Sequence, residues 1–325
     1  HREMFKQDMI HHLKLEHSAT QVKLILNGAF RYFTGLYSRL WQARRHEAAN
    51  YPAVFFYNLN ELDSQFMLVL SACRVNDPEE ALKVAHVSNG IDRVFSLLQL
   101  QGAYDSNEFA GRLFEISAEI RDQPAAAIPA VFDKHLLLEL QERRAVQVSQ
   151  GFSYALFKPI SLDRLNTRFT RYFFVRIERL LSVGMKLKMK HELQELVTSR
   201  GTRTGFHVEH ILSRNPESLA HFDGDEDRFE QERNRLGGLL LLKGKDNISS
   251  NNEVYAQKLK SYANTLYWNE TLREDAYKSK LDFADFAKTH QLAFRPQPQF
   301  GPTELEERHR LLFDLSAVIW ELNDA

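Results

Sequence analysis

Cysteine is nearly absent from this chain, which has Cys73 and no other cysteine in 325 residues. One cysteine can form neither a disulfide framework nor a cysteine-based zinc site. Zinc fingers, zinc ribbons and the zinc deaminases, which need a Pro-Cys-x-x-Cys block, are therefore excluded. A reducing, cytoplasmic compartment is expected, with Cys73 as a buried small apolar residue.

Long hydrophobic runs are also lacking. No apolar run approaches the roughly 20 residues that a membrane-spanning helix needs. No basic segment followed by an apolar one opens the chain, as a signal peptide would. The sequence thus predicts a soluble protein with no membrane partner. It opens on His1 inside an apparently helical pattern, which indicates a piece of a longer chain.

Net charge is small, at -1, but the charges are unevenly placed. Between Lys158 and Arg203 there are 11 Lys/Arg against 4 Asp/Glu, whereas residues 217–232 are acidic. A basic stretch of this kind suits a polyanion such as DNA, and it equally suits a solvated helix face. Charge alone does not decide between the two.

Hydrophobic periodicity predicts helix over most of the first 200 residues, because apolar residues recur at spacings of three and four. One such helix is expected to follow Asp77, and another to begin at Ser161 with Tyr172 and Phe173 in the core. Near Gly201 the pattern changes. "GTRTGFHVEH" and "GGLLLL" are short segments bounded by glycine and are predicted strands.

The segment between the two predicted strands is polar and longer than an ordinary loop, so we expect it to be functional or to carry a small helix. "EVYAQKLKSYANTLYW" then predicts a helix capped by Asn251 or Asn252. A terminal amphipathic helix runs through "ELEERHRLLFDLSAVIWEL".

Candidate chemistry lies in "GFHVEHILSRN", residues 205–215. On a strand His207 and Glu209 share one face, while His210 points to the other or turns out at the end. A metal on Glu209 and a neutral His210 beside it could hydrolyse a phosphodiester, since one stabilises the departing oxygen and the other takes a proton from water. Magnesium prefers a few oxygen ligands, and Asn247 could supply the second. A polar strand end rich in histidine is the alternative without catalysis.

Three blocks carry a family resemblance: "HVEHIL", "RLGGLLLL" and "DNISSNNEVYAQKLKSY". They resemble consecutive parts of the HNH, or ββα-metal, nuclease domain at the C-terminus of GmrSD-type modification-dependent (type IV) restriction endonucleases. The matched motifs span residues 206–262. The nuclease domain of RNA-guided CRISPR effectors is similar, with an asparagine nine residues after the position matched by Gly238, which is Asn247 here.

The resemblance implies a role for each matched residue. His210 would be the general base, and Glu209 and Asn247 would hold Mg²⁺ or Mn²⁺. Lys258 would lie near the scissile phosphate or support the site. His207 has no fixed family role and could contact phosphate or orient Glu209.

Two departures from the family pattern stand out. Gly238 occupies the place of an asparagine that braces the loop bearing the catalytic histidine, so the brace would have to come from Asn234 or from Asn252. Ser213 replaces a proline, which should affect only the stiffness of the turn. The family's N-terminal ParB-like nucleotide-binding module is expected to be missing from this chain.

The predicted fold is mainly α: a helical domain over 1–195, followed over 196–325 by a small ββα-metal (HNH) nuclease domain wrapped by C-terminal helices. The predicted function is metal-dependent cleavage or nicking of DNA in anti-phage restriction, with double-stranded, modified phage DNA as the expected substrate. Clean double-strand cuts would require two nuclease sites, as in a homodimer. Four arginines are candidate DNA contacts: Arg168, Arg171, Arg200 and Arg203.

Two alternatives remain at this point. A non-catalytic helical DNA-binding or protein-interaction module with a decayed HNH site is the first, because Gly238 departs from the family pattern. RNA as the substrate is the second, since the preference for DNA rests on family analogy alone.

Overall fold

The computed structural model describes most of the chain, namely residues 10–16, 18–47, 51–62, 65–244, 252–278 and 280–321. These residues are mainly helical, as expected, and their two strands form one small sheet. No helix in these ranges is both long enough and apolar enough to cross a bilayer.

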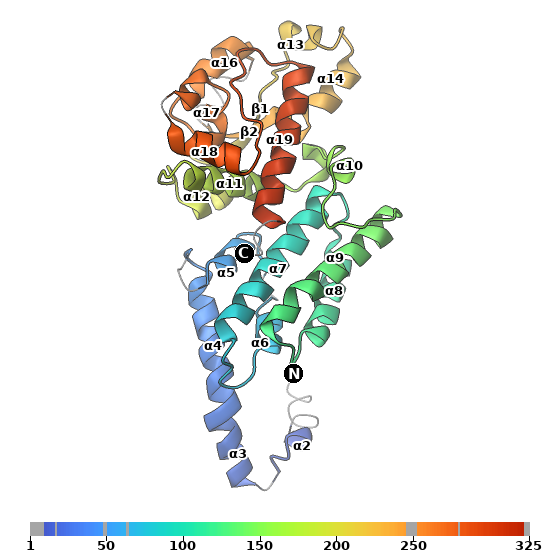
Figure 1. The fold of residues 1–325 in the computed structure, drawn as a ribbon, viewed down its shortest axis with the longest axis vertical. Coiled ribbons are helices and arrows are strands. Elements are labelled where there is room, and N and C mark those ends of the chain that lie inside the picture. The colour runs from blue at the N-terminus through green and yellow to red at the C-terminus, as the bar shows by residue number, and fades with distance from the viewer. Residues whose placement is uncertain are drawn as a thin grey trace. The chain divides into compact units, whose positions relative to one another are not determined.

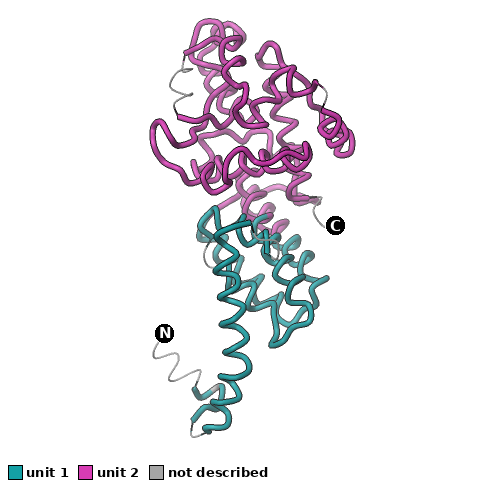
Figure 2. Tube along the Cα trace, turned by 90° about the vertical axis from the view of Figure 1, so that its left-hand side faces the viewer, with its two compact units in different colours: residues 1–92, 106–135 teal, residues 93–105, 136–325 magenta. Residues whose placement is uncertain are grey.

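The chain divides into two compact units, coloured separately in Figure 2. Unit 1 comprises residues 1–92 and 106–135, and unit 2 comprises residues 93–105 and 136–325. Residues 136–195 therefore group with the segment that carries the nuclease motifs. The expectation that 196–325 acts as a domain of its own stays a prediction.

Unit 1 is built from helices (Figure 1). Its elements are α2 (Ile10–His12), α3 (Ala19–Ile25), the π-helix η2 (Leu26–Phe30), α4 (Arg31–Ala43), α5 (Pro52–Asn58), α6 (Phe66–Ala72), the first part of α7 (Glu80–Leu100), α8 (Ser106–Glu119), η4 (Ala125–Ala127) and the first part of α9 (Ile128–Arg144). Cys73 is buried and free, as predicted. The helix expected after Asp77 is α7, where the Asp77 carboxylate accepts a hydrogen bond from the Glu79 amide (2.9 Å).

Unit 2 places helices around a two-stranded antiparallel sheet (Figure 1). After the ends of α7 and α9 its elements are α10 (Tyr154–Phe157), η5 (Leu162–Arg164), α11 (Thr167–Gly184), α12 (Leu193–Thr198), β1 (Phe206–His210), α13 (Pro216–Ala220), α14 (Glu226–Arg233), η6 (Leu236–Gly238), β2 (Leu239–Lys243), α16 (Tyr255–Ser261), α17 (Tyr267–Glu270), η7 (Glu274–Tyr277), α18 (Leu281–Thr289) and α19 (Pro302–Trp320). Both predicted strands are present, and the long segment between them carries α13 and α14.

The helix expected from Ser161 begins later, at Thr167. The Asn166 side chain accepts a hydrogen bond from the Phe169 amide (2.8 Å) and caps α11, because an asparagine at this position satisfies an otherwise unpaired N–H. The aromatic residues of α11 are buried, as predicted: Phe169, Tyr172, Phe173 and Phe174. This helix packs against both strands and against α19.

The helix expected from Glu253 to Trp268 is two helices, α16 and α17. Asn264 lies between them with a φ of 57°, a left-handed conformation that a continuous helix cannot contain. At the start of α16, Val254 occupies the cap position and makes no side-chain cap hydrogen bond, so Asn252 is not the cap. Asn251 lies outside the described residues.

Candidate active site

The register of the two strands positions the candidate residues. Glu209 lies opposite Leu240 and His210 lies opposite Leu239, at the end where β1 leaves the sheet. Successive side chains of a strand point to opposite faces, so Glu209 and His210 diverge even though they are adjacent.

Glu209 forms a buried ion pair with Lys258 of α16. The ammonium group of Lys258 also donates a hydrogen bond to the His210 carbonyl (2.7 Å). Burial raises the pKa of Glu209 and lowers that of Lys258, while their mutual attraction opposes both shifts. Lys258 therefore ties α16 to β1.

His210 contacts a side chain from the end of α14. Its Nε2 atom lies 2.7 Å from Oδ1 of Asn234. The Asn234 amide nitrogen donates to the Glu230 carbonyl (2.9 Å), so the amide oxygen faces the ring and Nε2 must carry the proton. Burial, followed by the nearby charge of Arg233, lowers the pKa of His210 to about 4. His210 is therefore a neutral imidazole at neutral pH, with the lone pair on Nδ1.

A network of arginines holds the Asn234 end of α14. The Glu230 carboxylate accepts two hydrogen bonds from Arg214, each 2.8 Å long. Arg233 is buried and donates from Nε to the Leu212 carbonyl (3.1 Å). Both arginine contacts join α14 to the turn that follows β1. Sequence reasoning missed Arg233, because the polar stretch around it gives no periodic sign that one face is buried.

Gly238 is packed closely at the start of β2. Its carbonyl accepts a hydrogen bond from the Ile211 amide (2.9 Å). A Cβ atom added there would lie 3.0 Å from the Arg233 carbonyl oxygen and 3.4 Å from Leu305. Asn234, one of the two residues from which the sequence analysis expected the brace to come, contacts His210 (2.7 Å). The other, Asn252, is exposed, and its carbonyl lies 3.5 Å from the Asn215 side chain.

The remaining predicted residues lie on β1, on α11 and in the loop that leads into β1. His207 Nε2 is 3.0 Å from the Gly201 carbonyl, in the loop that leads into β1. Arg171 donates to the Val197 and Ser199 carbonyls (3.4 and 3.2 Å), so it holds the start of this loop. Arg200 and Arg203 are exposed on the loop, and Arg168 is half-buried on α11.

The Glu209 carboxylate is the expected metal donor within the described residues, and Lys258 already contacts it. In the described part of the chain no three His, Cys, Asp or Glu side chains group closely enough to hold a metal ion. Mg²⁺ can be held by one or two protein oxygens, with water and phosphate completing its shell. The donor type therefore fits Mg²⁺. The expected second ligand, Asn247, lies outside the described residues.

Comparison with known families gives one match. Residues 159–315 match the family model described as GmrSD restriction endonucleases, C-terminal domain. The match begins just before η5 and includes both strands, α16 and most of α19. It confirms the resemblance seen in the motifs and relates this part of the chain to restriction endonucleases, and so in general terms to nuclease activity and defence. No curated protein and no solved structure matches the chain.

Proposed function

We propose that this protein is a metal-dependent DNA endonuclease or nickase of the HNH type, with β1, β2 and α16 as its ββα element. The observation that carries the proposal is the His210–Asn234 hydrogen bond (2.7 Å) within a segment related to restriction endonucleases. A histidine held through one ring nitrogen presents the other as a base. This arrangement is what water activation requires.

In the proposed reaction, a water molecule attacks the phosphorus of a DNA phosphodiester and gives its proton to Nδ1 of His210. The bond from phosphorus to the 3′-oxygen breaks, and the departing oxygen takes a proton from solvent, which leaves 5′-phosphate and 3′-hydroxyl ends. Asn234 keeps Nε2 protonated throughout, so the base cannot switch to the other nitrogen. A bound Mg²⁺ or Mn²⁺ would supply stabilisation of negative charge on the phosphate and on the departing oxygen.

Glu209 and Asn247 are the residues that would hold this cation. Lys258 neutralises Glu209 in the structure, so Glu209 would have to exchange part of its contact with the ammonium group for the metal. This requirement favours weak binding of the cation, at millimolar Mn²⁺ or Mg²⁺, over tight binding. The same ion pair also supports the competing proposal, in which the site is decayed and non-catalytic.

Arg200 and Arg203 are the predicted contacts with the DNA backbone, since both are exposed on the loop before β1. Arg168 and Arg171 remain candidates of lower accessibility, because Arg171 already donates to two carbonyls. Phosphate contacts of this kind carry affinity but no sequence preference. By the same family relation, we propose modified phage DNA as the substrate.

The test is conversion of supercoiled plasmid to nicked or linear DNA with Mg²⁺, Mn²⁺ or EDTA. Wild type should cut with either metal and stop in EDTA, while His210→Ala should be inactive and Glu209→Gln should lose its metal dependence together with its activity. His221→Ala, an exposed histidine of the same unit, is the matched control and should cut normally. If wild type and His210→Ala are equally inert with every metal while both shift DNA in a gel, the protein is a DNA-binding module and not a nuclease. Matched DNA and RNA strands in the same assay decide the substrate.

A further inference from the structure

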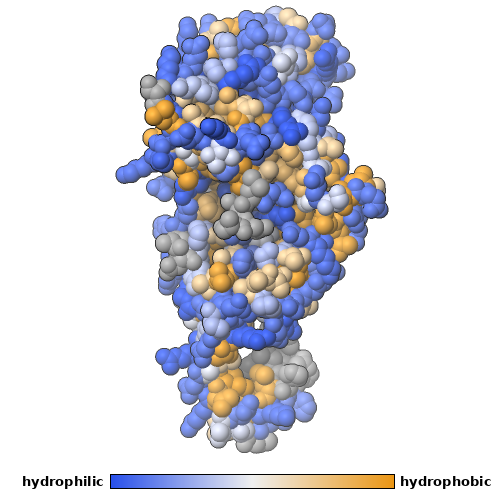
Figure 3. All heavy atoms as spheres, viewed as in Figure 1, coloured by the Kyte–Doolittle hydropathy of each residue, from blue (hydrophilic) through white to orange (hydrophobic). Residues whose placement is uncertain are grey.

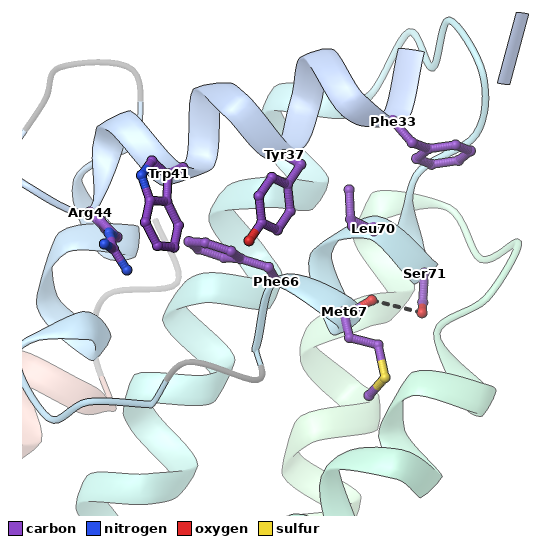
Figure 4. A pocket seen from close by; sticks show the side chains of 8 residues that line it. All are labelled: Phe33, Tyr37, Trp41, Arg44, Phe66, Met67, Leu70 and Ser71. Carbon is purple, nitrogen blue, oxygen red and sulfur yellow. Dashed lines mark hydrogen bonds between the residues drawn. The ribbon is translucent and has the colours of Figure 1, made fainter. Parts of the chain in front are cut away.

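An aromatic pocket in unit 1 is separate from every residue of the candidate active site. It has a volume of about 650 Å³ and lies between α4 and α6 (Figure 4). Tyr37 and Trp41 point from α4 toward Phe66 of α6, and Phe33, Met67 and Leu70 complete the lining. A volume of this size suits a small planar ligand.

The aromatic rings in the pocket have the geometry of a stacking platform. The Tyr37 and Trp41 rings are nearly parallel, with centroids 6.2 Å apart and planes 18° apart. Phe66 meets both rings edge-on and forms the wall behind them. The Arg44 guanidinium lies 3.1 Å from the centre of the Trp41 ring. Tyr37 and Trp41 remain 44% and 39% exposed, so a ligand can reach them.

The helix that carries this pocket is basic. Between Glu16 and Glu47 the sequence contains no acidic residue and five basic ones: Lys23, Arg31, Arg39, Arg44 and Arg45. Arg44 lines the pocket, and the adjacent Arg45 is exposed. Arg31 and Arg39 line a separate pocket beside Asp77 and Glu80, and Arg39 pairs with Glu80.

We propose that this face of α4 binds single-stranded nucleic acid, with unpaired bases stacked on Tyr37 and Trp41 and phosphates held by Arg44 and the adjacent Arg45. Aromatic side chains interleaved with basic ones are the usual platform for unpaired strands, because every base has a π-face and every nucleotide a charge. Arginine planes stack on bases in the same way. The site goes beyond the proposed nuclease, and the choice of DNA as the first probe rests on that proposal.

A different occupant must also be considered. Leu24, Leu26 and Phe30 are exposed and extend the apolar surface over α3 and η2, where Figure 3 shows hydrophobic colouring. An exposed patch of this kind can mark a protein interface. A protein interface built on aliphatic contacts would require neither parallel aromatic rings nor an arginine stacked on Trp41. The pocket therefore favours a nucleic-acid base as its occupant.

Trp41 provides its own reporter. The chain has three tryptophans, and Trp268 and Trp320 are buried, 1% and 4% exposed. We would titrate the full chain in EDTA, which prevents cleavage, with oligothymidylate and with an abasic strand of equal length. Oligothymidylate should quench the emission and bind tightly, whereas the abasic strand, with equal charge and no bases, should do neither. Oligouridylate and a DNA duplex of the same length test whether RNA or paired DNA binds as well as the proposed single-stranded ligand.

Tyr37→Ala and Trp41→Ala should each weaken oligothymidylate binding between about 5- and 100-fold, the range found for removal of one stacking ring. Binding to Trp41→Phe is measured by the anisotropy of a labelled strand. This variant should retain most of the affinity and lose the quenching. Retained affinity would show that the substitution has not disrupted the fold. Phe114→Ala removes an exposed aromatic of α8 in the same unit and should change nothing.

Each outcome is decisive. Equal affinity for the base-bearing and abasic strands overturns stacking, and unchanged Trp41 emission with all probes overturns the site in favour of a protein partner. Binding is measured in EDTA, so this test is independent of the cleavage test. Strand binding without plasmid cutting would contradict only the nuclease proposal. Metal-dependent cutting without strand binding would contradict only the strand-binding proposal.

Discussion

His210 Nε2 lies 2.7 Å from the side-chain oxygen of Asn234, and the other end of that amide is bonded to the Glu230 carbonyl. The orientation of the amide is therefore fixed by the backbone of α14, and it in turn fixes which nitrogen of His210 carries the proton. A residue 24 positions from the histidine thus sets the protonation of its ring.

Asn234→Ala should lower plasmid cleavage by roughly 10- to 100-fold, the usual effect of removing the partner that orients a functional histidine. Asn234→Asp keeps an acceptor beside Nε2 and should lose less. Initial cleavage rates under saturating metal, with circular dichroism as the check on folding, measure both. Gly238→Asn should not rescue Asn234→Ala, because a side chain there meets the Arg233 carbonyl oxygen at 3.0 Å. Full activity in Asn234→Ala would show that the contact has no part in catalysis.

Lys258→Met should destabilise the fold by about 3 to 5 kcal/mol, since it leaves the Glu209 carboxylate buried without its partner. The double variant Glu209→Gln, Lys258→Met removes both charges and should recover much of that loss. Urea unfolding of the two single variants and the double variant gives the coupling energy between the residues. Lys186→Met, which breaks an exposed pair with Asp282, is the control and should have little effect. Additive single variants would mean that the two charges do not interact.

The two strands, and the strand on which the candidate residues lie, could be predicted from the sequence. Glycine-bounded apolar segments and a period of two are local signals. Glu209 and His210 were assigned to β1 in this way. Lys258 was expected to support the site or to lie near the phosphate, and the sequence could not show that it pairs with Glu209, 49 positions away along the chain. Asn234 and Asn252 were equal candidates for the brace, since spacing alone cannot say which one folds back on His210.

Helix ends were predicted less well than helix cores. Ser161 and Asn166 are both good caps, and the choice between them depends on the backbone of η5, where Leu162 donates to the Asn234 carbonyl (2.8 Å). The aromatic pocket was not foreseen at all. Tyr37 and Trp41 share a helix face, but Phe66 reaches them only through the packing of α6 on α4.

Stability should fall between pH 6.5 and 3 because of His309. This histidine is buried on α19 and accepts a hydrogen bond from the Gly237 amide through Nδ1 (3.2 Å). Burial, with the charge of Arg235, lowers its pKa to about 3 in the folded state, against about 6.5 in the unfolded chain. The unfolded state thus takes up the proton more readily, so the stabilisation is complete above pH 6.5 and is lost as pH falls toward 3. At 1.36 kcal/mol per unit the loss is on the order of 5 kcal/mol.

Urea unfolding of wild type and His309→Asn over this pH range measures the effect. Asparagine can still accept from Gly237 but does not titrate, so the variant should show a flatter profile than wild type. His221→Asn, at an exposed histidine, should leave the wild-type profile unchanged. Parallel curves for wild type and His309→Asn would assign the acid sensitivity to other groups.

Gly237 and Gly111 should respond to alanine with opposite signs. A Cβ on Gly237 would lie 2.5 Å from the His309 amide nitrogen and from the Leu305 carbonyl oxygen, both backbone atoms of α19 that cannot step aside. Gly237→Ala should therefore destabilise by about 1 to 3 kcal/mol, and it should also slow cleavage because η6 leads into β2 beside His210. Gly111 lies in α8 with nothing within 4 Å of its Cβ position, so Gly111→Ala should stabilise by about 0.5 to 1 kcal/mol through its better helix propensity. Thermal unfolding of the two variants compares the same chemical change in two surroundings. If Gly237→Ala were as stable as wild type, α19 would not be packed against η6 as closely as the structure shows.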